Sequence, residues 1–156
     1  MKWRRSLWLV ALVACSAPES SKRIIATDQA PAAIGPYSQA VEAGGTLYLA
    51  GQIGIDPATG QLVTGGIEAE TQQVMANLSA VLDAAGYTFG DVVQAQVYLV
   101  DLAEYDAFNL LYADYFTGPP PARAVVEVQR LPRDARVEIM MVAVKSRPSA
   151  QAGRYY

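Results

Sequence analysis

The chain has 156 residues, of which 52% are hydrophobic and 17% charged, with 12 Lys and Arg against 15 Asp and Glu. It contains no histidine, and its single cysteine is Cys15. This composition excludes histidine acid/base catalysis, Cys-His nucleophiles and most zinc sites. Any chemistry must therefore come from Arg, Glu, Asp, Tyr, Ser, Asn or backbone groups.

Residues 1–14 have the pattern of a secretion signal. The cations Lys2, Arg4 and Arg5 precede an apolar run at 7–14, and Cys15 follows directly. At about 1.5 Å per residue the run is too short to span a bilayer core about 30 Å thick. We therefore interpret residues 1–14 as a cleaved signal peptide.

The end of this leader resembles the lipobox of bacterial lipoproteins, with the residues Leu12-Val13-Ala14-Cys15. The resemblance implies cleavage before Cys15 and acylation of its thiol, and acyl chains contribute about 0.8 kcal/mol per buried methylene to membrane binding. An ordinary signal peptide with an incidental cysteine is the alternative. Ser16 occupies the position where lipoproteins retained in the inner membrane favour Asp. We expect a lipid anchor on the periplasmic side of a membrane, and Ser16 favours the outer membrane over the inner one.

Removal of residues 1–14 changes the charge of the chain. It takes away three cations and no acids, which leaves nine cations against 15 acids and a net charge of −6. An acidic domain without clusters of Lys and Arg is poorly suited to phosphate backbones. Nucleic acid is therefore not an expected partner.

The region after the anchor divides into an acylated tether at 15–22, a single domain at 23–145 and a polar tail at 146–156. About 120 residues is a normal size for one domain with one core. Strand-forming residues favour four strands, at 46–50, 92–100, 122–128 and 136–144. Weaker strand patterns occur at 23–26 and 38–41.

Two helices are predicted by their apolar period. The helix at 67–85 has apolar residues three or four positions apart, and Gly86 supplies its stop: these residues are Val74, Leu78, Val81, Leu82 and Ala85. A second helix begins at Asp101, with Glu104 completing a start like a capping box, and ends at Gly118 and the following prolines. Its apolar stripe consists of Tyr105, Phe108, Leu111 or Tyr112, and Tyr115.

The order of elements predicts an α+β sandwich, a mixed sheet with two helices on one face. In the last strand, Val137, Ile139, Met141 and Ala143 point one way, yet the opposite face is apolar too. Two helices can cover only one face of the sheet. We expect the other face to pack against a copy of the chain in an oligomer.

Arg123 is the first candidate for chemistry. Alternation along 122–128 predicts that Ala124, Val126 and Val128 face the helices, which turns Arg123, Val125 and Glu127 away from them. An isolated arginine of this kind is usually a surface or ion-paired residue. The functional alternative is a guanidinium that grips a substrate carboxylate through two parallel hydrogen bonds.

Several ordered motifs in the domain resemble the RidA/YjgF reactive-intermediate deaminases. The resemblance covers residues 23–145. The motifs are Gly35-Pro36-Tyr37-Ser38-Gln39-Ala40, Leu49-Ala50-Gly51-Gln52-Ile53, Asp56-Pro57-Ala58-Thr59-Gly60, Pro121-Ala122-Arg123, Leu131-Pro132 and Val137-Glu138-Ile139.

This resemblance implies a chorismate-mutase-like protomer, a homotrimer and three clefts between subunits. The family hydrolyses 2-iminobutanoate and 2-iminopropanoate to 2-oxo acids and ammonia, with no metal or organic cofactor. By resemblance, Arg123 binds the carboxylate and Glu138 is associated with the catalytic water. Tyr37 and Asn109 line or approach the pocket, and the backbone of Gly51 approaches the ligand.

Three features depart from the family pattern and affect the substrate range. Ala50 replaces a frequent serine, so one hydroxyl contact to the ligand is missing. Val125 replaces a frequent cysteine and makes that wall apolar. The link between Tyr115 and Arg123 is shorter than is common.

The first hypothesis is a deaminase of small 2-imino or enamino acids, in which Glu138 acts as base, acid or both. Pairing of Glu138 with Arg123 or Arg136 for structure alone is the alternative for that residue. The second hypothesis is a non-catalytic trimeric module that binds small carboxylates or acts as a chaperone. Net acidity and the lack of histidine disfavour ribonuclease activity, which has been attributed to relatives.

Overall fold

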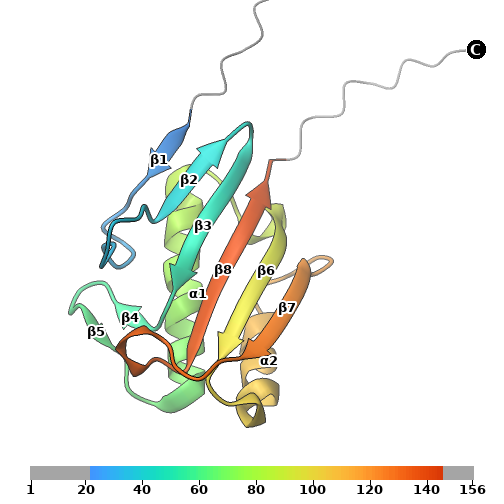
Figure 1. Cartoon of the computed structure of the whole chain (residues 1–156). Coiled ribbons are helices and arrows are strands. Elements are labelled where there is room, and N and C mark those ends of the chain that lie inside the picture. Colours follow the sequence, from blue (N-terminus) through green and yellow to red (C-terminus); the bar gives the residue numbers. More distant parts are fainter. Residues whose placement is uncertain (1–21, 146–156) are drawn as a thin grey trace, which may run out of the picture.

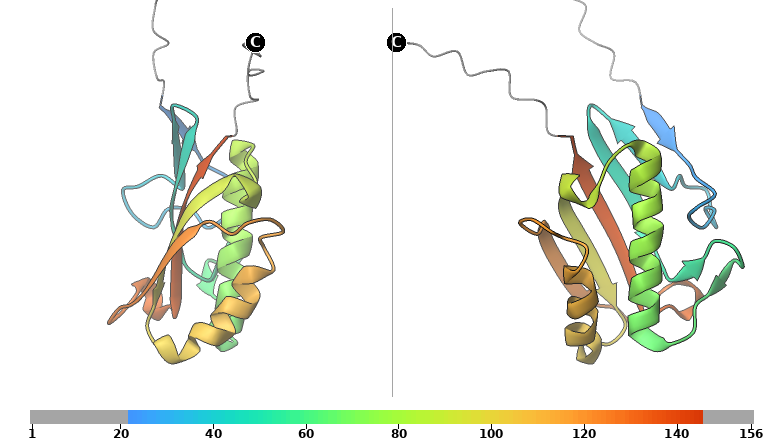
Figure 2. Two further views of the ribbon diagram at one scale, coloured as in Figure 1. Left: turned by 90° about the vertical axis from the view of Figure 1, so that its right-hand side faces the viewer. Right: turned by 180° about the vertical axis from the view of Figure 1, so that it is seen from behind.

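The computed structural model describes residues 22–145. The predicted signal at 1–14, Cys15, most of the tether and the tail at 146–156 lie outside the described residues. The domain is a six-stranded sheet with two helices packed on one of its faces, as Figures 1 and 2 show. The predicted α+β sandwich with a mixed sheet is confirmed.

The strands follow one another across the sheet in the order β1-β2-β3-β8-β6-β7. Only β6 and β7 pair in parallel, and the other neighbours are antiparallel. Their bounds are β1 Arg23–Ile25, β2 Ala40–Ala43, β3 Thr46–Gln52, β6 Val92–Leu99, β7 Ala122–Glu127 and β8 Val137–Val144. All six strands overlap the segments that the sequence predicts, with ends that differ by one or two residues.

A small hairpin beside the main sheet was not predicted. It pairs β4 (Ile55–Asp56) with β5 (Gln61–Leu62). The side chain of Asp56 accepts a 2.8 Å hydrogen bond from the amide of Ala58, and Gly60 closes the turn with a φ of 68°. An aspartate that bonds the backbone two residues on, followed by a glycine with positive φ, is a common turn.

Helix α1 (Gly66–Ala85) confirms the first predicted helix. The residues of its predicted stripe are buried, and Gly86 ends the helix in a left-handed conformation with a φ of 79°. The amide of Gly86 donates to the carbonyl of Asp83, and that of Tyr87 donates to Leu82. Glycine adopts this conformation at no steric cost, which explains the stop.

The second helix is shorter than predicted. A 3-10 turn, η2 (Leu102–Glu104), leads into α2 (Tyr105–Ala113), which ends before Gly118. Asp101 caps the turn by accepting a 2.8 Å hydrogen bond from the amide of Ala103. The predicted capping box is wrong, because the carboxylate of Glu104 pairs with Arg136 instead of returning to the backbone of Asp101.

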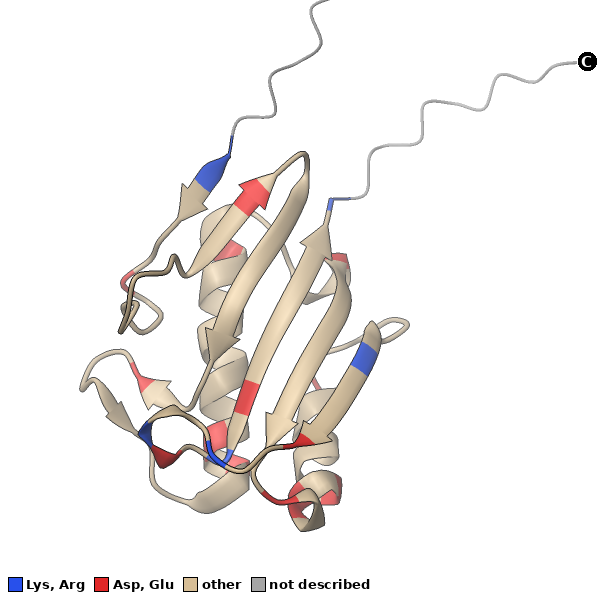
Figure 3. Cartoon of the chain, in the orientation of Figure 1, with Lys and Arg blue, Asp and Glu red and all other residues tan. Residues whose placement is uncertain are grey.

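The two faces of the sheet differ in what covers them. On β8, Val137, Ile139, Met141 and Ala143 are at most 1% exposed beneath the helices. The opposite face is apolar and partly exposed, with Tyr48 53% and Val126 44% exposed. Figure 3 shows few charged residues along the strands of the sheet. No helix within residues 22–145 is long and apolar enough to cross a membrane.

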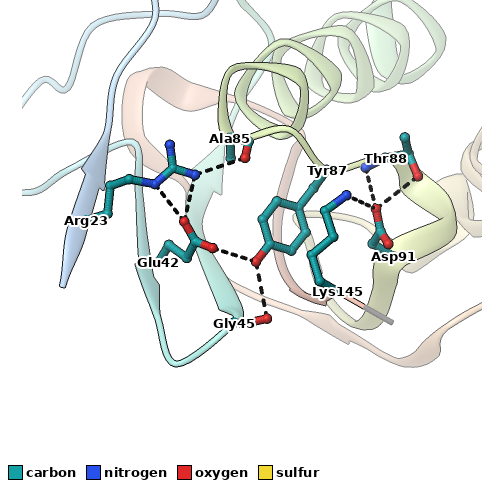
Figure 4. A network of polar contacts seen from close by, with 8 residues as sticks. All are labelled: Arg23, Glu42, Gly45, Ala85, Tyr87, Thr88, Asp91 and Lys145. Atoms are coloured by element: carbon teal, nitrogen blue, oxygen red, sulfur yellow. Dashed lines mark hydrogen bonds and ion pairs between the residues drawn. The ribbon is translucent and has the colours of Figure 1, made fainter. Parts of the chain in front are cut away.

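A polar network closes the end of the domain near the first and last described residues (Figure 4). Arg23 on β1 pairs with Glu42 on β2 at 2.6 Å, and the hydroxyl of Tyr87 donates to Glu42 at 3.0 Å. Lys145 pairs with Asp91 of η1 (Phe89–Asp91) and lies over the ring of Tyr87. The network therefore connects the outer strands to the segment after α1.

Candidate functional site

Glu138 lies in a pocket on the open face of the sheet. This pocket, which we call the Glu138 pocket, has a volume of about 350 Å³. Its lining residues are Ile34, Gly35, Tyr37, Ala50, Gly51, Ile53, Pro132 and Glu138. Four residues that the sequence singles out, Tyr37, Ala50, Gly51 and Glu138, thus come together from three separate segments.

Gly51 makes room for the side chain of Glu138. A Cβ atom added at Gly51 would overlap Oε1 of Glu138 and lie 2.9 Å from Cδ and 3.1 Å from Cγ. Real Cβ atoms almost never approach that closely, so any other residue would displace the carboxylate. A glycine is required here by the packing of Glu138, a reason separate from the close approach to a ligand that resemblance implies.

The carboxylate of Glu138 is partly buried and unpaired. Within residues 22–145 it has neither a hydrogen-bond partner nor an ion-pair partner, and burial raises its pKa above the ordinary value. The alternative of a structural pair with an arginine is wrong, since Arg136 pairs with Glu104 and Arg123 bonds other groups. A carboxylate in a poorly solvated pocket is a better proton acceptor than one in water.

The loop that carries Tyr37 is held by Gln39, a residue whose role was not predicted. Gln39 is buried, and its amide nitrogen donates to the carbonyls of Thr27, Ala30 and Pro31 at 2.8 to 3.2 Å. Its amide oxygen accepts a 2.7 Å bond from the amide of Thr27. The place of Gln39 in a motif that carries the family resemblance, directly before β2, was the only signal for this role.

Arg123 faces the helices, and the predicted orientation of β7 is wrong. Arg123 pairs with Ala95, which is fully buried, whereas Val126 pairs with Tyr98 on the open face. The alternation along β7 is real, but both faces of this edge strand carry apolar residues. The pattern of apolar residues along β7 therefore could not identify the face that the helices cover.

The guanidinium of Arg123 is surrounded by side chains of α2. Its Nη2 donates to Oδ1 of Asn109 at 2.8 Å and to the hydroxyl of Tyr105 at 3.2 Å. The rings of Tyr105, Phe108 and Tyr112 lie 5.8, 5.6 and 4.6 Å from Cζ. Such contacts with the faces of aromatic rings stabilise a cation without neutralising it. We call these five residues the Arg123 cluster.

Two hollows adjoin the Arg123 cluster. One of about 390 Å³ is lined by Leu102, Tyr105, Arg123 and Val125. The other, of about 650 Å³, lies between α2 and the proline-rich link, and its lining residues are Asn109, Tyr112, Ala113, Phe116, Gly118, Pro120, Pro121 and Arg123. No carboxylate within residues 22–145 pairs with Arg123, so its positive charge is available to an anion. Of the two non-functional alternatives for Arg123, a surface residue or an ion-paired one, the ion pair is therefore wrong.

The Glu138 pocket and the Arg123 cluster do not meet in one protomer. Glu138 pairs with Tyr98 across β8 and β6, and its side chain lies on the open face. Arg123 lies on the helix face of β7. The residues predicted to act together thus form two half-sites. Among the described residues, no group of three or more Cys, Asp or Glu is placed to hold a metal ion.

Known proteins match both the sequence and the fold. The family model described as endoribonuclease L-PSP matches residues 27–145. The chain belongs to this family, which includes RidA and YjgF. It is 48% identical to the 2-iminobutanoate/2-iminopropanoate deaminase of Mus musculus over 124 residues, 80% of this chain and 92% of that protein. It is 50% identical to a RutC family protein of Pyrococcus horikoshii, over 80% of this chain and 98% of that protein.

Solved structures of RidA-family proteins have the same fold. The YjgF gene product of E. coli is 41% identical with a TM-score of 0.76, over 80% of this chain and 99% of that one. TdcF of E. coli, solved with bound serine, is 35% identical with a TM-score of 0.77, over 80% of this chain and 99% of that one.

Proposed function

We propose that this RidA-family protein hydrolyses small 2-imino acids to 2-oxo acids and ammonia. The observation that carries the proposal is a pair of complementary half-sites: an unneutralised guanidinium beside a hollow, and an unpaired carboxylate of raised pKa in a pocket. The relatives named as deaminases support this chemistry, since they are about half identical to the chain. The serine bound to TdcF is also a small carboxylate.

The complete site would form between protomers. The open face of the sheet is apolar and holds the Glu138 pocket, and β7 with Arg123 is at the edge of the same sheet. Packing of one protomer's open face against the edge of its partner would cover the apolar surface and bring Arg123 to the Glu138 pocket. A closed trimer contains three such junctions and leaves no open face.

In the proposed mechanism, Arg123 holds the substrate carboxylate and fixes the position of the imine carbon. That carbon is electrophilic when its nitrogen is protonated. Glu138 accepts a proton from water as the water oxygen bonds to the imine carbon, which gives a tetrahedral amino alcohol. Glu138 returns that proton to the nitrogen, which becomes an ammonium group. Glu138 then takes the hydroxyl proton as the carbonyl forms, the carbon–nitrogen bond breaks and ammonia leaves. No cofactor is needed for this sequence.

The test measures ammonia release from 2-iminopropanoate, generated by an amino-acid oxidase, in the presence of purified protein. Arg123→Ala should lower the rate on the order of a hundredfold or more, since a carboxylate grip contributes a few kcal/mol. Arg130→Ala is the matched control, because Arg130 is exposed and, among residues 22–145, pairs only with Asp134. Equal rates for wild type and Arg123→Ala would remove Arg123 from the mechanism.

The same assay addresses the alternative of a module that binds without turnover. Ala50 and Val125 line the Glu138 pocket and the hollow beside Arg123, and both are apolar. Binding of 2-oxobutanoate by wild type, together with no acceleration of ammonia release, would favour that alternative. The lining residues make small apolar substituents on the substrate the best fit for either function.

We also propose that the protein acts outside the cytoplasm on a lipid anchor at Cys15, on the periplasmic side of a membrane, with the outer membrane favoured over the inner one. Support comes from the cationic and apolar leader and from the lipobox-like residues before Cys15. Labelling of cells with an alkyne fatty acid should modify the wild-type protein and leave Cys15→Ser unlabelled. Recovery of wild type unlabelled in the cytoplasmic fraction would contradict this location.

A further inference from the structure

Tyr105 is in contact with Arg123 and has no part in the motifs that predict the site. It begins α2, and its hydroxyl lies 3.2 Å from Nη2 of Arg123. Its ring is within 5.8 Å of the guanidinium carbon. Tyr105 also lines the smaller hollow, together with Leu102, Arg123 and Val125.

Some of the hydrogen-bond donors of the Arg123 guanidinium already have acceptors within the protein. Nη2 carries two hydrogens, and it has two acceptors, Oδ1 of Asn109 and the hydroxyl of Tyr105. A guanidinium grips a carboxylate through two parallel bonds along one of two edges, either Nε with Nη2 or Nη1 with Nη2. Both edges include Nη2. The predicted two-bond grip therefore cannot form while both contacts persist.

The hydroxyl of Tyr105 is able to supply the missing donor. A phenol oxygen that accepts a bond from Nη2 keeps its own hydrogen for another partner. The pKa of Tyr105 is lowered by its hydrogen bond with Asn109 and by the charge of Arg123. A more acidic phenol donates a stronger hydrogen bond to an anion.

We propose that Tyr105 is a substrate-binding residue whose hydroxyl donates to one oxygen of the substrate carboxylate, while Nη1 of Arg123 donates to the other. Asn109 retains its 2.8 Å contact and holds the guanidinium in place. The ligand class is a small 2-oxo or 2-imino carboxylate with an apolar substituent against Leu102 and Val125. The identity of this ligand rests on the proposed function, whereas the role of Tyr105 has a separate test.

The test is calorimetric titration of the full protein with 2-oxobutanoate, which binds without turnover. Tyr105→Phe keeps the ring over the guanidinium and removes only the hydroxyl. We expect its dissociation constant to rise about tenfold, the loss typical of one hydrogen bond to a charged group. Tyr115→Phe is the matched control, since Tyr115 packs on Phe89 away from Arg123. The uncharged 2-oxobutanamide should bind wild type and Tyr105→Phe equally.

A second measurement uses the pH dependence of binding. The charged groups that act on Tyr105 are Arg123 of β7 and Asp106 of α2. Ionised Tyr105 cannot donate and repels a carboxylate. Wild type should therefore lose affinity as the pH rises through a pKa below the ordinary tyrosine value, and Tyr105→Phe should not.

The outcomes separate the two proposals. Unchanged or tighter binding by Tyr105→Phe, with binding abolished in Arg123→Ala, would overturn the role of Tyr105 and leave that of Arg123 intact. An affinity of wild type that stays level through the alkaline range would also overturn it. Wild-type affinity in Arg123→Ala would instead overturn the proposed function.

Discussion

The carboxylate of Glu138 occupies the space that a side chain at Gly51 would fill. Gly51→Ala should therefore displace Glu138 and lower the rate of imine hydrolysis on the order of tenfold or more. Its cost in stability should be small, because the atoms that must move belong to the end of a flexible, unpaired side chain. Gly90→Ala is the control, because its Cβ would meet only Oγ1 of Thr88, at an ordinary contact distance of 3.4 Å, and Gly90 lines neither the Glu138 pocket nor the hollows beside Arg123. If the overlap with Glu138 is the cause, Gly51→Ala should lower the rate no further in a Glu138→Ala background.

Burial of Glu138 predicts how activity depends on pH. Its pKa is raised, and the proposed base must be ionised, so kcat/KM should fall on the acid side at a pH above the ordinary glutamate value. Glu138→Gln should abolish this dependence together with most of the rate. Glu68→Gln, at an exposed position on α1, should preserve both. A fall in kcat/KM that begins only at the ordinary glutamate pKa would contradict the role of Glu138 as the base.

The ionised carboxylate of Glu138 should lower the stability of the fold at neutral pH. Folding raises the pKa of the Glu138 carboxyl, so the folded state favours the protonated form. The loss in the free energy of unfolding is therefore absent below the unfolded pKa and grows as the pH rises above it. Glu138→Gln should therefore raise the melting temperature at pH 7 and change it little at pH 4. A lower melting temperature at pH 7 would show that the wild-type carboxylate has a stabilising partner.

Asn109 should act through Arg123. Asn109→Ala removes the 2.8 Å contact that holds the guanidinium in place. We expect KM for the imino acid to rise about tenfold with a smaller change in kcat, because the hydrogen bond positions a binding group and not a reacting one. Steady-state kinetics measure this split. An equal loss in kcat with unchanged KM would place Asn109 at the reacting atoms instead.

The network around Glu42 should stabilise the fold. The hydrogen bonds from Arg23 and then Tyr87 lower the pKa of Glu42, so its contribution is present above the unfolded value of 4.5 and is lost as pH falls through the lowered folded pKa. Glu42→Gln should cost about 1 kcal/mol at pH 7 and progressively less in acid. Chemical denaturation at both pH values measures the difference. Asp134→Asn, which breaks an exposed pair, should change stability little.

Much of the fold could be predicted because local signals and packing agree. Gly86 ends α1 as its position after the apolar stripe predicts, and the strands at β3, β6, β7 and β8 have the expected composition. The end of α2 was missed because Tyr115 and Phe116 extend the aromatic pattern of the helix beyond Ala113. They pack as rings around Phe89 and Tyr112 and do not continue the helix.

The candidate site was predicted by residue type and not by geometry. Tyr37, Gly51 and Glu138 share one pocket, as the resemblance implies. The face of Arg123 was predicted wrongly, since an edge strand with apolar residues on both sides gives no signal for the covered face. The roles of Tyr105 and Gln39 were not predicted because they depend on contacts made by the folded chain. Tyr105 contacts Arg123 on β7, and Gln39 contacts the loop that precedes it.

The most direct test of a site shared between protomers combines two inactive variants. Arg123→Ala and Glu138→Gln are produced together in one cell, with tags that allow mixed oligomers to be purified. If each site takes Arg123 from one protomer and Glu138 from its partner, purified mixed trimers should have about a third of the wild-type sites, because one of their three junctions joins an intact Arg123 to an intact Glu138. Mixing Arg123→Ala with the double variant should restore none. Purified mixed oligomers without recovered activity would contradict the account.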